Sequence, residues 1–551
     1  MDNSSIRSGF YNDRNDLVVE SMAGAVYSSN TLARLKGAPE IKVLLRSDWD
    51  KAQDGKKQVA LISGGGSGHE PAHGGFVGKG MLTAAVLGDV FASPGVDAIL
   101  AAILSVVGEA GCLLIIKNYT GDRIAFGLAA EKAKAAGHKV EMVVVGDDVS
   151  LDVAHPRGIA GTLFIHKIAG AMAERGASLN DIYAEAIATA DIIASYGVSL
   201  TSCTIPGSAK VEAIPAGEME LGLGIHGEPG AKKAPVTTVA AMIATMVDEI
   251  DKNLPKEGEV AVLVNNLGAV SNLEMGVVIK SLMDSALSKR IGLIIGPHHL
   301  MTSLDMNGFS LSCLPMNTAK KDFLLYPVPD IPAWSPGVVP AMKEFDLPEG
   351  IIPTYAASEN PGVYKTIKKV CDTLIAAEDE LNLMDRAVGD GDTGTTFAKG
   401  AKKIVAELDS LPLNHPRELS LALGELLSQS VGGSSGILLS IFFTATATSM
   451  TNDEPWSSHA IAKGIDGVMH YGGAKLGERT MLDAMIPAME AWDNGLGAAT
   501  RAAEAGVENT KNIEKTDAGR SSYVPGDKLR GRADPGAYAI ALVLKACLSL
   551  D

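Results

Sequence analysis

Cysteines are few in this sequence, and their spacing excludes the usual structural metal sites. Five of the 551 residues are cysteines. They are scattered, mostly inside apolar runs, and lack the close spacing of zinc ligands. An odd number of dispersed thiols is typical of a protein kept in a reducing compartment. We therefore expect reduced thiols and a cytoplasmic protein. The five are Cys112, Cys203, Cys313, Cys371 and Cys547.

Basic blocks and long apolar runs are also missing. The formal net charge is −17 and no Lys/Arg-rich block occurs, which argues against nucleic acid and anionic membranes as partners. MDNSSIRSGF lacks the pattern of a signal peptide, and GILLSIFFTATATSM is too short and polar-flanked to span a bilayer. ATP remains allowed, because phosphate sites use local backbone N–H groups rather than global charge.

The common phosphate-binding signatures are absent as well. The sequence contains no Walker G-x4-G-K-[ST] motif and no H-R-D or D-F-G set of protein kinases. Internal repeats and low-complexity tracts are also lacking. A phosphoryl-transfer site in this chain would therefore need a different architecture.

What is present divides the chain into two halves with different patterns. From about residue 15 to 330, β-rich runs alternate with helical stretches, which predicts parallel or mixed α/β sheets. The proline-dense PVPDIPAWSPGVVP follows and predicts an extended linker. After about residue 360 helical periodicity dominates and predicts an antiparallel all-α bundle of roughly seven to nine helices. We place the domains at 1–330 and 359–551, joined by a linker at 331–358.

One histidine in the first half is surrounded by glycines. His226 lies in GLGIHGEPG, and glycine is used where φ must be positive or where something approaches closely. The stretch is therefore either a tight turn that carries a histidine or a bare platform that offers an imidazole to a small ligand. By spacing alone the turn is the commoner explanation.

Polar residues follow two predicted strands of the same half. LISGGGSGHEPAH predicts a flexible, donor-rich loop over residues 64–68, followed by His69. LLIIKNYTGDR places Lys117, Asn118 and Asp122 at the carboxyl end of a strand, where α/β sheets bind ligands. Together with His226, these groups suit a small polyhydroxylated carbonyl compound. Imidazole and amide groups would bind its oxygens, and a carboxylate could take a hydroxyl proton.

The helical half contains an acidic cluster. MDRAVGDGDTGTT places Asp385, Asp390 and Asp392 within eight residues, where they would repel each other unless a cation lay between them. Carboxylate oxygens suit Mg²⁺, which takes phosphate oxygens and water as its other ligands. A solvated Asp-Gly turn is the alternative.

Two helix starts in the same half could bind phosphate. VGGSSGILLS precedes an apolar helix, and RADPGAYA places an Asp cap and a Pro at another helix start. Exposed N–H groups and the helix dipole favour anions at such positions. Plain capping is the alternative for each, but together with the aspartates they indicate a nucleotide site.

At these motifs the chain resembles the dihydroxyacetone kinase family, in its single-chain, ATP-dependent form. The matching stretches are SGGGSGHEPAH, GKGMLTAAVLGDVFASP, KNYTGD, GIHGEPG, NNLG, GDGDTGTTF, GGSSG and DPGA, in order along nearly the whole chain. The resemblance implies a substrate-binding half of two α/β subdomains with mixed sheets and an all-helical nucleotide domain. It also implies a homodimer in which the nucleotide domain of one subunit serves the substrate domain of the other.

The resemblance also implies roles for individual residues. His226 would add to the substrate carbonyl as a covalent hemiaminal, Asp122 would accept the hydroxyl proton, and His69 would assist. The substrate pocket would be lined by Gly66, Ser67, Gly68, His69, Lys117 and Asp122. Mg²⁺ would be bound by Asp385, Asp390 and Asp392. ATP would be surrounded by Asp392, Thr393, Gly394, Thr395, Thr396, Ser434, Ser435, Gly436, Gly473, Thr480, Met481, Asp534, Pro535 and Gly536. Fusion of both halves without a carrier module predicts free ATP as the phosphoryl donor.

Four functions remain open from the sequence. The first is a dihydroxyacetone kinase, and the second is a kinase for another short carbonyl compound such as glyceraldehyde or erythrulose. The third, known in some family members, is cyclisation of FAD by a lyase reaction at the nucleotide site with Mn²⁺. The fourth is a ligand sensor without catalysis. The intact aspartates and His226 favour an enzyme, because a sensor could lose them without harm.

Overall fold

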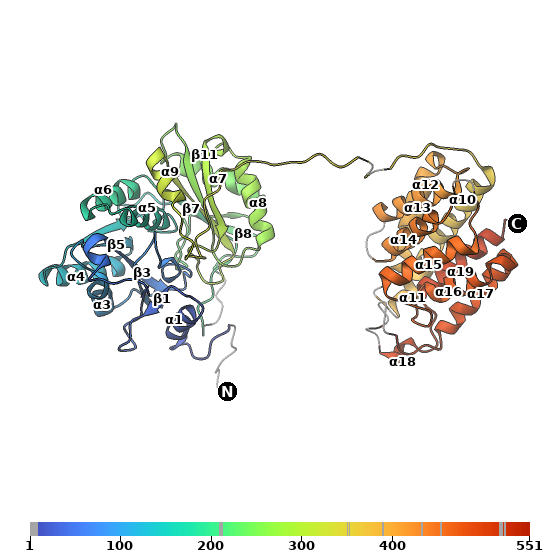
Figure 1. The fold of residues 1–551 in the computed structure, drawn as a ribbon, viewed down its shortest axis with the longest axis horizontal. Helices are drawn as coiled ribbons and strands as arrows, with labels where there is room; N and C mark the ends of the chain where they lie inside the picture. The colour runs from blue at the N-terminus through green and yellow to red at the C-terminus, as the bar shows by residue number, and fades with distance from the viewer. Residues whose placement is uncertain are drawn as a thin grey trace. The chain divides into compact units, whose positions relative to one another are not determined.

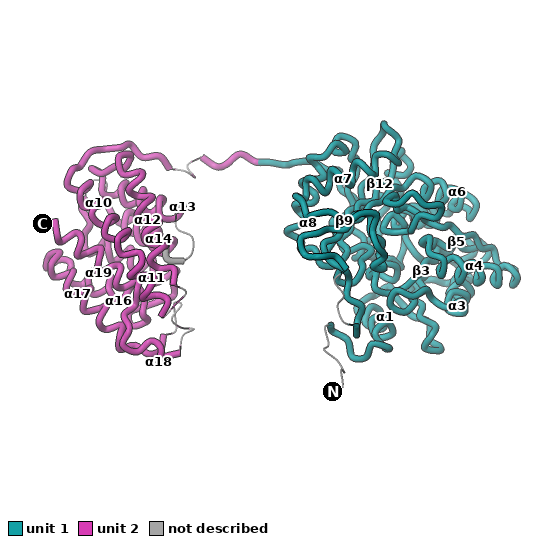
Figure 2. The backbone as a smooth tube through the Cα atoms, turned by 180° about the vertical axis from the view of Figure 1, so that it is seen from behind, with its two compact units in different colours: residues 1–344 teal, residues 345–551 magenta. Residues whose placement is uncertain are grey.

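The computed structural model describes most of the chain (Figure 1). It describes residues 9–208, 213–349, 351, 353–387, 389, 391–430, 434–451, 454–516, 522 and 525–550. The chain forms two compact units, an α/β unit of residues 1–344 and a helical unit of residues 345–551 (Figure 2). The predicted fold class is thereby confirmed.

The α/β unit begins with a six-stranded mixed sheet in the order β1-β2-β4-β3-β5-β6. β3, β4, β5 and β6 pair in parallel, and β1 and β2 add antiparallel strands at one edge. The strands are β1 (Leu32–Arg34), β2 (Val43–Arg46), β3 (Ala60–Ser67), β4 (Ala84–Val90), β5 (Cys112–Lys117) and β6 (Val140–Val145). The helices of this part are α1 (Leu17–Tyr27), α2 (Asp54–Lys57), η1 (Gly74–Phe76), α3 (Val96–Val106), α4 (Thr120–Ala135), α5 (Thr162–Glu174) and α6 (Leu179–Ala190).

A second six-stranded sheet has the order β11-β10-β12-β7-β8-β9. Its β10 and β11 are parallel and its other pairs are antiparallel. The strands are β7 (Ala194–Ser199), β8 (Glu218–Leu221), β9 (Lys232–Pro235), β10 (Val260–Asn266), β11 (Ile291–His298) and β12 (Gly308–Pro315). The helices are α7 (Val239–Asp251), α8 (Asn272–Met283), η2 (Ser288–Arg290) and α9 (Thr318–Leu325).

Helix α5 lies at the centre of the unit. Eleven of its thirteen residues are buried, and its apolar side chains share one core with strands of both sheets, including Leu113 of the first and Leu263 of the second. Helices α3 and α4 cover the other face of the first sheet, and α7 and α8 cover the outer face of the second. The carboxyl ends of β3 and β5 therefore open beside the second sheet, which is where the candidate site lies.

The proline-rich stretch expected as a linker begins as part of the α/β unit. Ile331 and Trp334 are only 2% and 4% exposed and belong to its core. Val338 pairs with Ile294 of β11. The free energy gained by burying these apolar side chains holds this proline-rich segment against the α/β core.

The helical unit contains no strand among its described residues, as predicted. The stretch TIKKVCDTLIAAEDELNLMD contributes to two helices, α10 and α11, that meet at Ala377. Successive long helices pack against one another, as in an antiparallel bundle. The helices are α10 (Pro361–Ala376), α11 (Glu378–Arg386), α12 (Thr393–Glu407), η3 (Leu408–Ser410), α13 (Pro416–Ser430), α14 (Ser434–Thr448), α15 (Ser458–Gly472), α16 (Leu482–Glu490), η4 (Trp492–Asn494), α17 (Leu496–Thr510), α18 (Gly526–Leu529) and α19 (Pro535–Leu548).

Among the described residues, no helix is long and apolar enough to cross a membrane.

Candidate active site

His226 lies in the loop between β8 and β9, at the edge of the second sheet. Its Nε2 atom is 3.0 Å from Nε2 of His69, which follows β3 of the first sheet. Its ring also packs nearly perpendicular to the rings of Tyr119 and Phe91, with ring centroids 4.5 and 5.3 Å away. Two histidines that are 157 residues apart in the sequence therefore meet in one aromatic pocket.

Glu228 fixes the orientation of the His226 ring. Its Oε1 lies 3.1 Å from Nδ1 of His226, and its Oε2 accepts a hydrogen bond of 2.9 Å from the His226 backbone N–H. Burial alone would raise the pKa of Glu228, but the hydrogen bonds and charge of His226 lower it to about 2. Since an ionised carboxylate only accepts, Nδ1 of His226 carries a proton, and Nε2 faces His69 across the pocket.

The glycines around His226 serve the loop itself. A Cβ at Gly224 would come within 2.3 Å of the Glu228 carboxylate, and Gly222 adopts a φ of +69°. Arg157 ties the base of the loop by donating to the Gly222 carbonyl at 2.8 Å and to Asp148 at 2.8 Å. The bare backbone thus makes room for the carboxylate that orients the imidazole.

His69 is completely buried beside the ring that it contacts. Burial, and then the positive charge of Lys117, hold the pKa of His69 well below its usual value. Its Nδ1 lies 2.8 Å from the Thr302 carbonyl, which can only accept, so Nδ1 carries a proton. Nε2 of His69 and Nε2 of His226 would then both be acceptors, and a contact of 3.0 Å requires one proton between them. A hydrogen bond between the two rings would therefore place one proton between the two Nε2 atoms.

Lys117 and Asp122 lie together at the end of β5 and the first turn of α4. Nζ of Lys117 and Oδ1 of Asp122 are buried and have no hydrogen-bond partner among the described residues. Burial lowers the pKa of Lys117 to about 8, although nearby carboxylates, Asp122 first, oppose this. Burial likewise raises the pKa of Asp122, against the charge of Lys117. Nζ of Lys117 is thus available as a hydrogen-bond donor to a small ligand, and Oδ1 of Asp122 is available as an acceptor.

The glycine-rich segment before His69 differs from its prediction. Residues 64–67 belong to β3 rather than to a loop, because the absence of side chains lets the neighbouring backbone approach. A Cβ at Gly64 would lie 2.4 Å from the Val86 carbonyl, and one at Gly66 would lie 2.8 Å from the Ala92 nitrogen. The Ser67 hydroxyl donates to the Gly88 carbonyl at 2.7 Å, and the Gly68 N–H donates to Glu70 at 2.9 Å.

Several residues of this site were not predicted from the sequence. Glu228, Tyr119, Phe91 and Arg157 all contact His226 or its loop. Only Glu228 left a usable signal, as the acidic residue two positions after the histidine in GIHGEPG.

The second group of candidate residues lies at one end of the helical unit. A Cβ at Gly536 would lie 3.4 Å from the Met481 nitrogen, which places the start of α19 against the start of α16. Arg532 donates to the Ala387 carbonyl at 3.3 Å, so the α11–α12 turn lies there too. A Cβ at Gly472 would lie 3.0 Å from Leu438, which brings the end of α15 to the start of α14. Four helix N-termini, those of α12, α14, α16 and α19, therefore share this end and favour a polyphosphate.

Side chains at these helix starts brace the turns. Thr480 N–H donates to Asp483 at 2.9 Å, and Asp534 accepts from the Ala537 N–H at 2.8 Å as an N-cap. Thr395 exchanges hydrogen bonds with Asn382, which joins α11 to α12. Gly473, with a φ of +71°, ends α15. The predicted nucleotide residues that the structure describes thus lie on the turns and helix starts of this end.

The acidic cluster can be assessed in part. Oδ2 of Asp385 accepts from the N–H groups of Gly391, Asp392 and Thr393 at 2.9 to 3.1 Å. A Cβ at Gly389 would come within 2.2 Å of Oδ1 of Asp385, so a glycine there keeps this oxygen accessible. Asp392 is exposed at the start of α12. These hard oxygen donors fit Mg²⁺.

Some predicted residues lie outside the described part of the chain. Asp390 is outside the described residues, and the side chains of Ser434 and Ser435 are not described. Within the described ranges, no three His, Cys, Asp or Glu side chains group closely enough to bind a metal ion.

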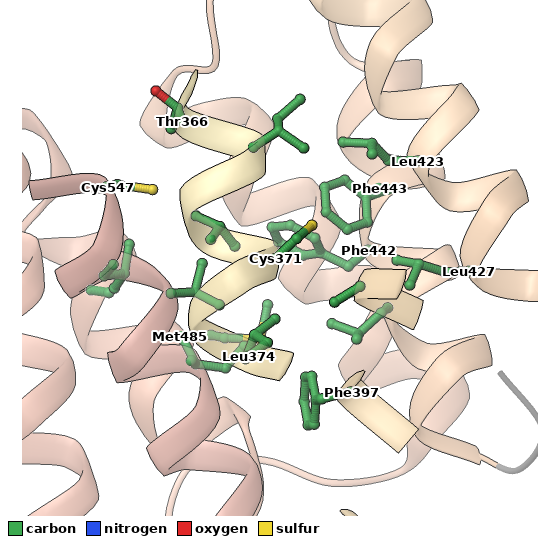
Figure 3. Close-up of a pocket in the computed structure, with 18 of the residues that line it drawn as sticks. Thr366, Cys371, Leu374, Phe397, Leu423, Leu427, Phe442, Phe443, Met485 and Cys547 are labelled. Carbon is green, nitrogen blue, oxygen red and sulfur yellow. The ribbon is translucent and has the colours of Figure 1, made fainter. Parts of the chain in front are cut away.

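A separate cavity of about 460 Å³ lies inside the helical unit (Figure 3). Leu374, Phe397, Leu427, Phe442 and Met485 are among its lining residues, and the lining is almost entirely apolar. It offers no charge to a triphosphate, so we distinguish it from the phosphate-binding end.

Comparison with known proteins defines the class of this chain. Residues 24–331 match the Dak1 domain and residues 387–549 match the DAK2 domain, so the two halves are a Dak1 unit followed by a DAK2 unit. The chain belongs to the dihydroxyacetone kinase family, and the resemblance seen in its motifs is confirmed.

The individual relatives match nearly the whole chain. It is 46% identical to the dihydroxyacetone kinase of Citrobacter freundii over 98% of both chains. It is 39% identical to the triokinase/FMN cyclase of Homo sapiens over 96% of this chain and 97% of that one. The crystal structure of the Citrobacter freundii kinase with AMP-PNP and Mg²⁺ matches with a TM-score of 0.81 and 45% identity. The match covers 98% of this chain and 100% of that chain.

Proposed function

We propose that this protein transfers the γ-phosphoryl group of ATP to dihydroxyacetone, which it holds as a covalent hemiaminal on His226. The observation that carries the proposal is the contact between His69 and His226. Nε2 of His226 faces the pocket 3.0 Å from Nε2 of His69, and Nδ1 lies 3.1 Å from the ionised Glu228. This arrangement suits addition to a carbonyl carbon, and it explains how a ketone would be distinguished from glycerol.

The addition step uses the proton shared by Nε2 of His69 and Nε2 of His226. The shared proton moves to His69, whose lowered pKa makes the protonated ring a strong acid, and Nε2 of His226 attacks the carbonyl carbon; a C–N bond forms and the C=O π bond breaks. The carbonyl oxygen takes the proton from His69. His226 becomes an imidazolium whose positive charge is balanced by Glu228, 3.1 Å away. The hemiaminal therefore leaves no uncompensated charge in the pocket.

Phosphoryl transfer then uses Asp122 and Lys117. The Asp122 carboxylate accepts the proton of a terminal hydroxyl as the hydroxyl oxygen bonds to the γ-phosphorus, and ADP leaves. Lys117 donates to a substrate oxygen, since its buried ammonium has no other partner among the described residues. Gly66, Ser67 and Gly68 line the pocket.

In the helical unit, the four helix starts bind the triphosphate through backbone N–H groups. Asp385, Asp390 and Asp392 would hold Mg²⁺, which neutralises phosphate charge when bound. The adenosine and phosphates lie among residues 392–396, 434–436, 480–481 and 534–536 and Gly473. We further propose a cytoplasmic homodimer that exchanges nucleotide domains between subunits.

A coupled assay of ADP release tests the proposal. Dihydroxyacetone, glyceraldehyde, erythrulose and glycerol are compared with ATP·Mg²⁺, and turnover of dihydroxyacetone without turnover of glycerol is expected. Turnover of glycerol would contradict carbonyl capture. His226→Ala should lose turnover while it still binds ATP, and full activity of this variant would refute the covalent step.

A second candidate concerns the range of activities. A relative that is 39% identical is named triokinase/FMN cyclase, which favours glyceraldehyde as an alternative acceptor and cyclisation of FAD as a side reaction. The same assay ranks the acceptors by kcat/KM. Incubation with FAD and Mn²⁺, followed by chromatography of the flavin products, tests the cyclase.

A further inference from the structure

A second group of buried polar side chains lies behind Lys117, between the first sheet and the central helix α5. Ser63, His73, Lys117 and His166 are each 2% exposed or less. Ser63 of β3 pairs with Ile115 of β5, and Lys117 lies two residues beyond Ile115. Since strand side chains alternate between faces, Ser63 and Lys117 lie on the same face of the sheet.

The hydrogen-bonding state of His73 follows from its neighbour. The Ser63 hydroxyl donates its one proton to the Ile115 carbonyl at 2.6 Å, so it can only accept from Nδ1 of His73, 3.3 Å away. Nδ1 of His73 is therefore protonated, and Nε2 carries an unshared electron pair. That Nε2 atom is buried and has no partner among the described residues.

His166 extends this unsatisfied polar group. Its ring packs edge-on against His73, with ring centroids 5.2 Å apart. Both of its ring nitrogens are buried without partners, as is Nζ of Lys117. Leaving a buried polar atom unpaired is unfavourable, so these four atoms require a partner that is both donor and acceptor. Water meets this requirement.

We infer that ordered water fills the space between Lys117, His73 and His166 and solvates the lysine ammonium from behind. The two histidines are thus positioning residues, which hold Lys117 as a charged donor toward the substrate pocket. This inference rests on the proposed function, for which Lys117 binds a substrate oxygen.

The charges around Lys117 are consistent with this arrangement. Asp122, Glu228, Asp147 and Glu70 all raise the pKa of Lys117 against burial, which lowers it to about 8. Burial, and then the charge of Lys117, lower the pKa of His166 to about 3. Burial and the same charge hold the pKa of His73 well below its usual value, and Lys117 also lowers the pKa of His69. The histidines behind the lysine are therefore neutral and add no repulsive charge.

The test removes the ring nitrogens of His166 and keeps an aromatic ring at this position. His166→Phe fits beside Phe76, whose ring centroid is 6.4 Å away. Phe164→Leu is the matched control, because Phe164 is fully buried on the same helix and carries no polar atom. The kcat/KM for dihydroxyacetone is measured against pH, together with the KM for ATP.

In wild type, kcat/KM for dihydroxyacetone should fall as the pH rises through about 8, where Lys117 loses its proton. In His166→Phe the Lys117 ammonium is less solvated, so its pKa is lower. The pH at which kcat/KM falls should therefore decrease by about one unit. At pH 8 the KM for dihydroxyacetone should rise about fivefold, with an unchanged KM for ATP. His166→Gln should recover part of the shift, and Phe164→Leu should keep the wild-type profile. An unshifted profile in His166→Phe would overturn the inference.

A crystal structure of the wild-type protein without substrate provides a test that needs neither a variant nor turnover. Ordered water within hydrogen-bond distance of Nζ of Lys117 and of a nitrogen of His73 or His166 supports the inference. A space without water would overturn it, whether or not the protein phosphorylates dihydroxyacetone. Failure of the wild-type protein to phosphorylate any carbonyl compound would instead refute the proposed function.

Discussion

Replacing Glu228 by Gln tests how His226 is activated. The wild-type carboxylate accepts from Nδ1 and from the backbone N–H of His226, at 3.1 and 2.9 Å. In the hemiaminal it also faces the imidazolium charge. The amide of Glu228→Gln is uncharged, so it can accept one of these bonds but cannot balance the charge.

The expected loss of kcat/KM follows from the hydrogen bond to His226, which no longer involves a charged carboxylate in Glu228→Gln. A hydrogen bond to a charged group contributes about 1.5–3 kcal/mol, and each 1.36 kcal/mol changes a rate about tenfold. We therefore expect kcat/KM for dihydroxyacetone to fall about 10- to 150-fold in Glu228→Gln. The KM for ATP should not change, because the residues that we propose to bind ATP lie in the helical unit.

Glu220→Gln is the matched control for this variant. Glu220 accepts from the Gly230 N–H at 2.8 Å and so holds the same loop, but no hydrogen bond joins it to His226 in the described structure. Steady-state kinetics and thermal unfolding are measured for both variants. Together they distinguish a loss of His226 activation from a loss of stability of the loop that carries it. Wild-type kcat/KM in Glu228→Gln, or an equal loss in Glu220→Gln, would refute the reasoning.

Three further predictions follow from the two units. Asp122→Asn should lower kcat about 10²- to 10⁴-fold, as expected for loss of a general base, with little change in the KM for dihydroxyacetone; an unchanged kcat would exclude Asp122 as the base. Gly394→Ala should destabilise the helical unit in thermal unfolding, because its Cβ would meet the Glu378 carbonyl at 2.0 Å, whereas Gly362→Ala, with nothing closer than 3.6 Å, should not. The pKa of Glu228 is about 2 in the folded protein against 4.5 unfolded, so its stabilisation is complete above pH 4.5 and is lost as the pH falls toward 2. Acid unfolding of Glu228→Gln should lack this component, and an identical acid limb in both proteins would contradict the assignment.

The sequence was sufficient to place the first-sheet part of the site. LLIIKNYTGDR reads as a buried strand followed by polar residues, and parallel strands present such residues at their carboxyl ends. Lys117 and Asp122 lie there in the structure, at the end of β5 and the start of α4. The contact between His69 and His226 could not be predicted from local sequence. It depends on the position of the second sheet, which is set by packing across α5. The family resemblance implied that both histidines act on the same substrate, which hydrophobic periodicity could not indicate.

Other features depend on backbone details that residue type does not encode. GGGS was expected as a loop, but its lack of side chains lets it continue as β3 between two close neighbours. Glu228 reaches His226 only because Gly224 leaves room for the carboxylate. His73 and His166 lie in ordinary stretches of sequence, and their importance follows only from their buried, unpartnered nitrogens.

The most direct test of covalent capture is a crystal structure of the protein with dihydroxyacetone, with His226→Ala as the control. The proposed mechanism predicts continuous electron density and a C–N bond of about 1.5 Å between Nε2 of His226 and the former carbonyl carbon. His226→Ala should show no such adduct. An intact ketone at van der Waals distance from Nε2 in the wild-type protein would contradict the covalent step.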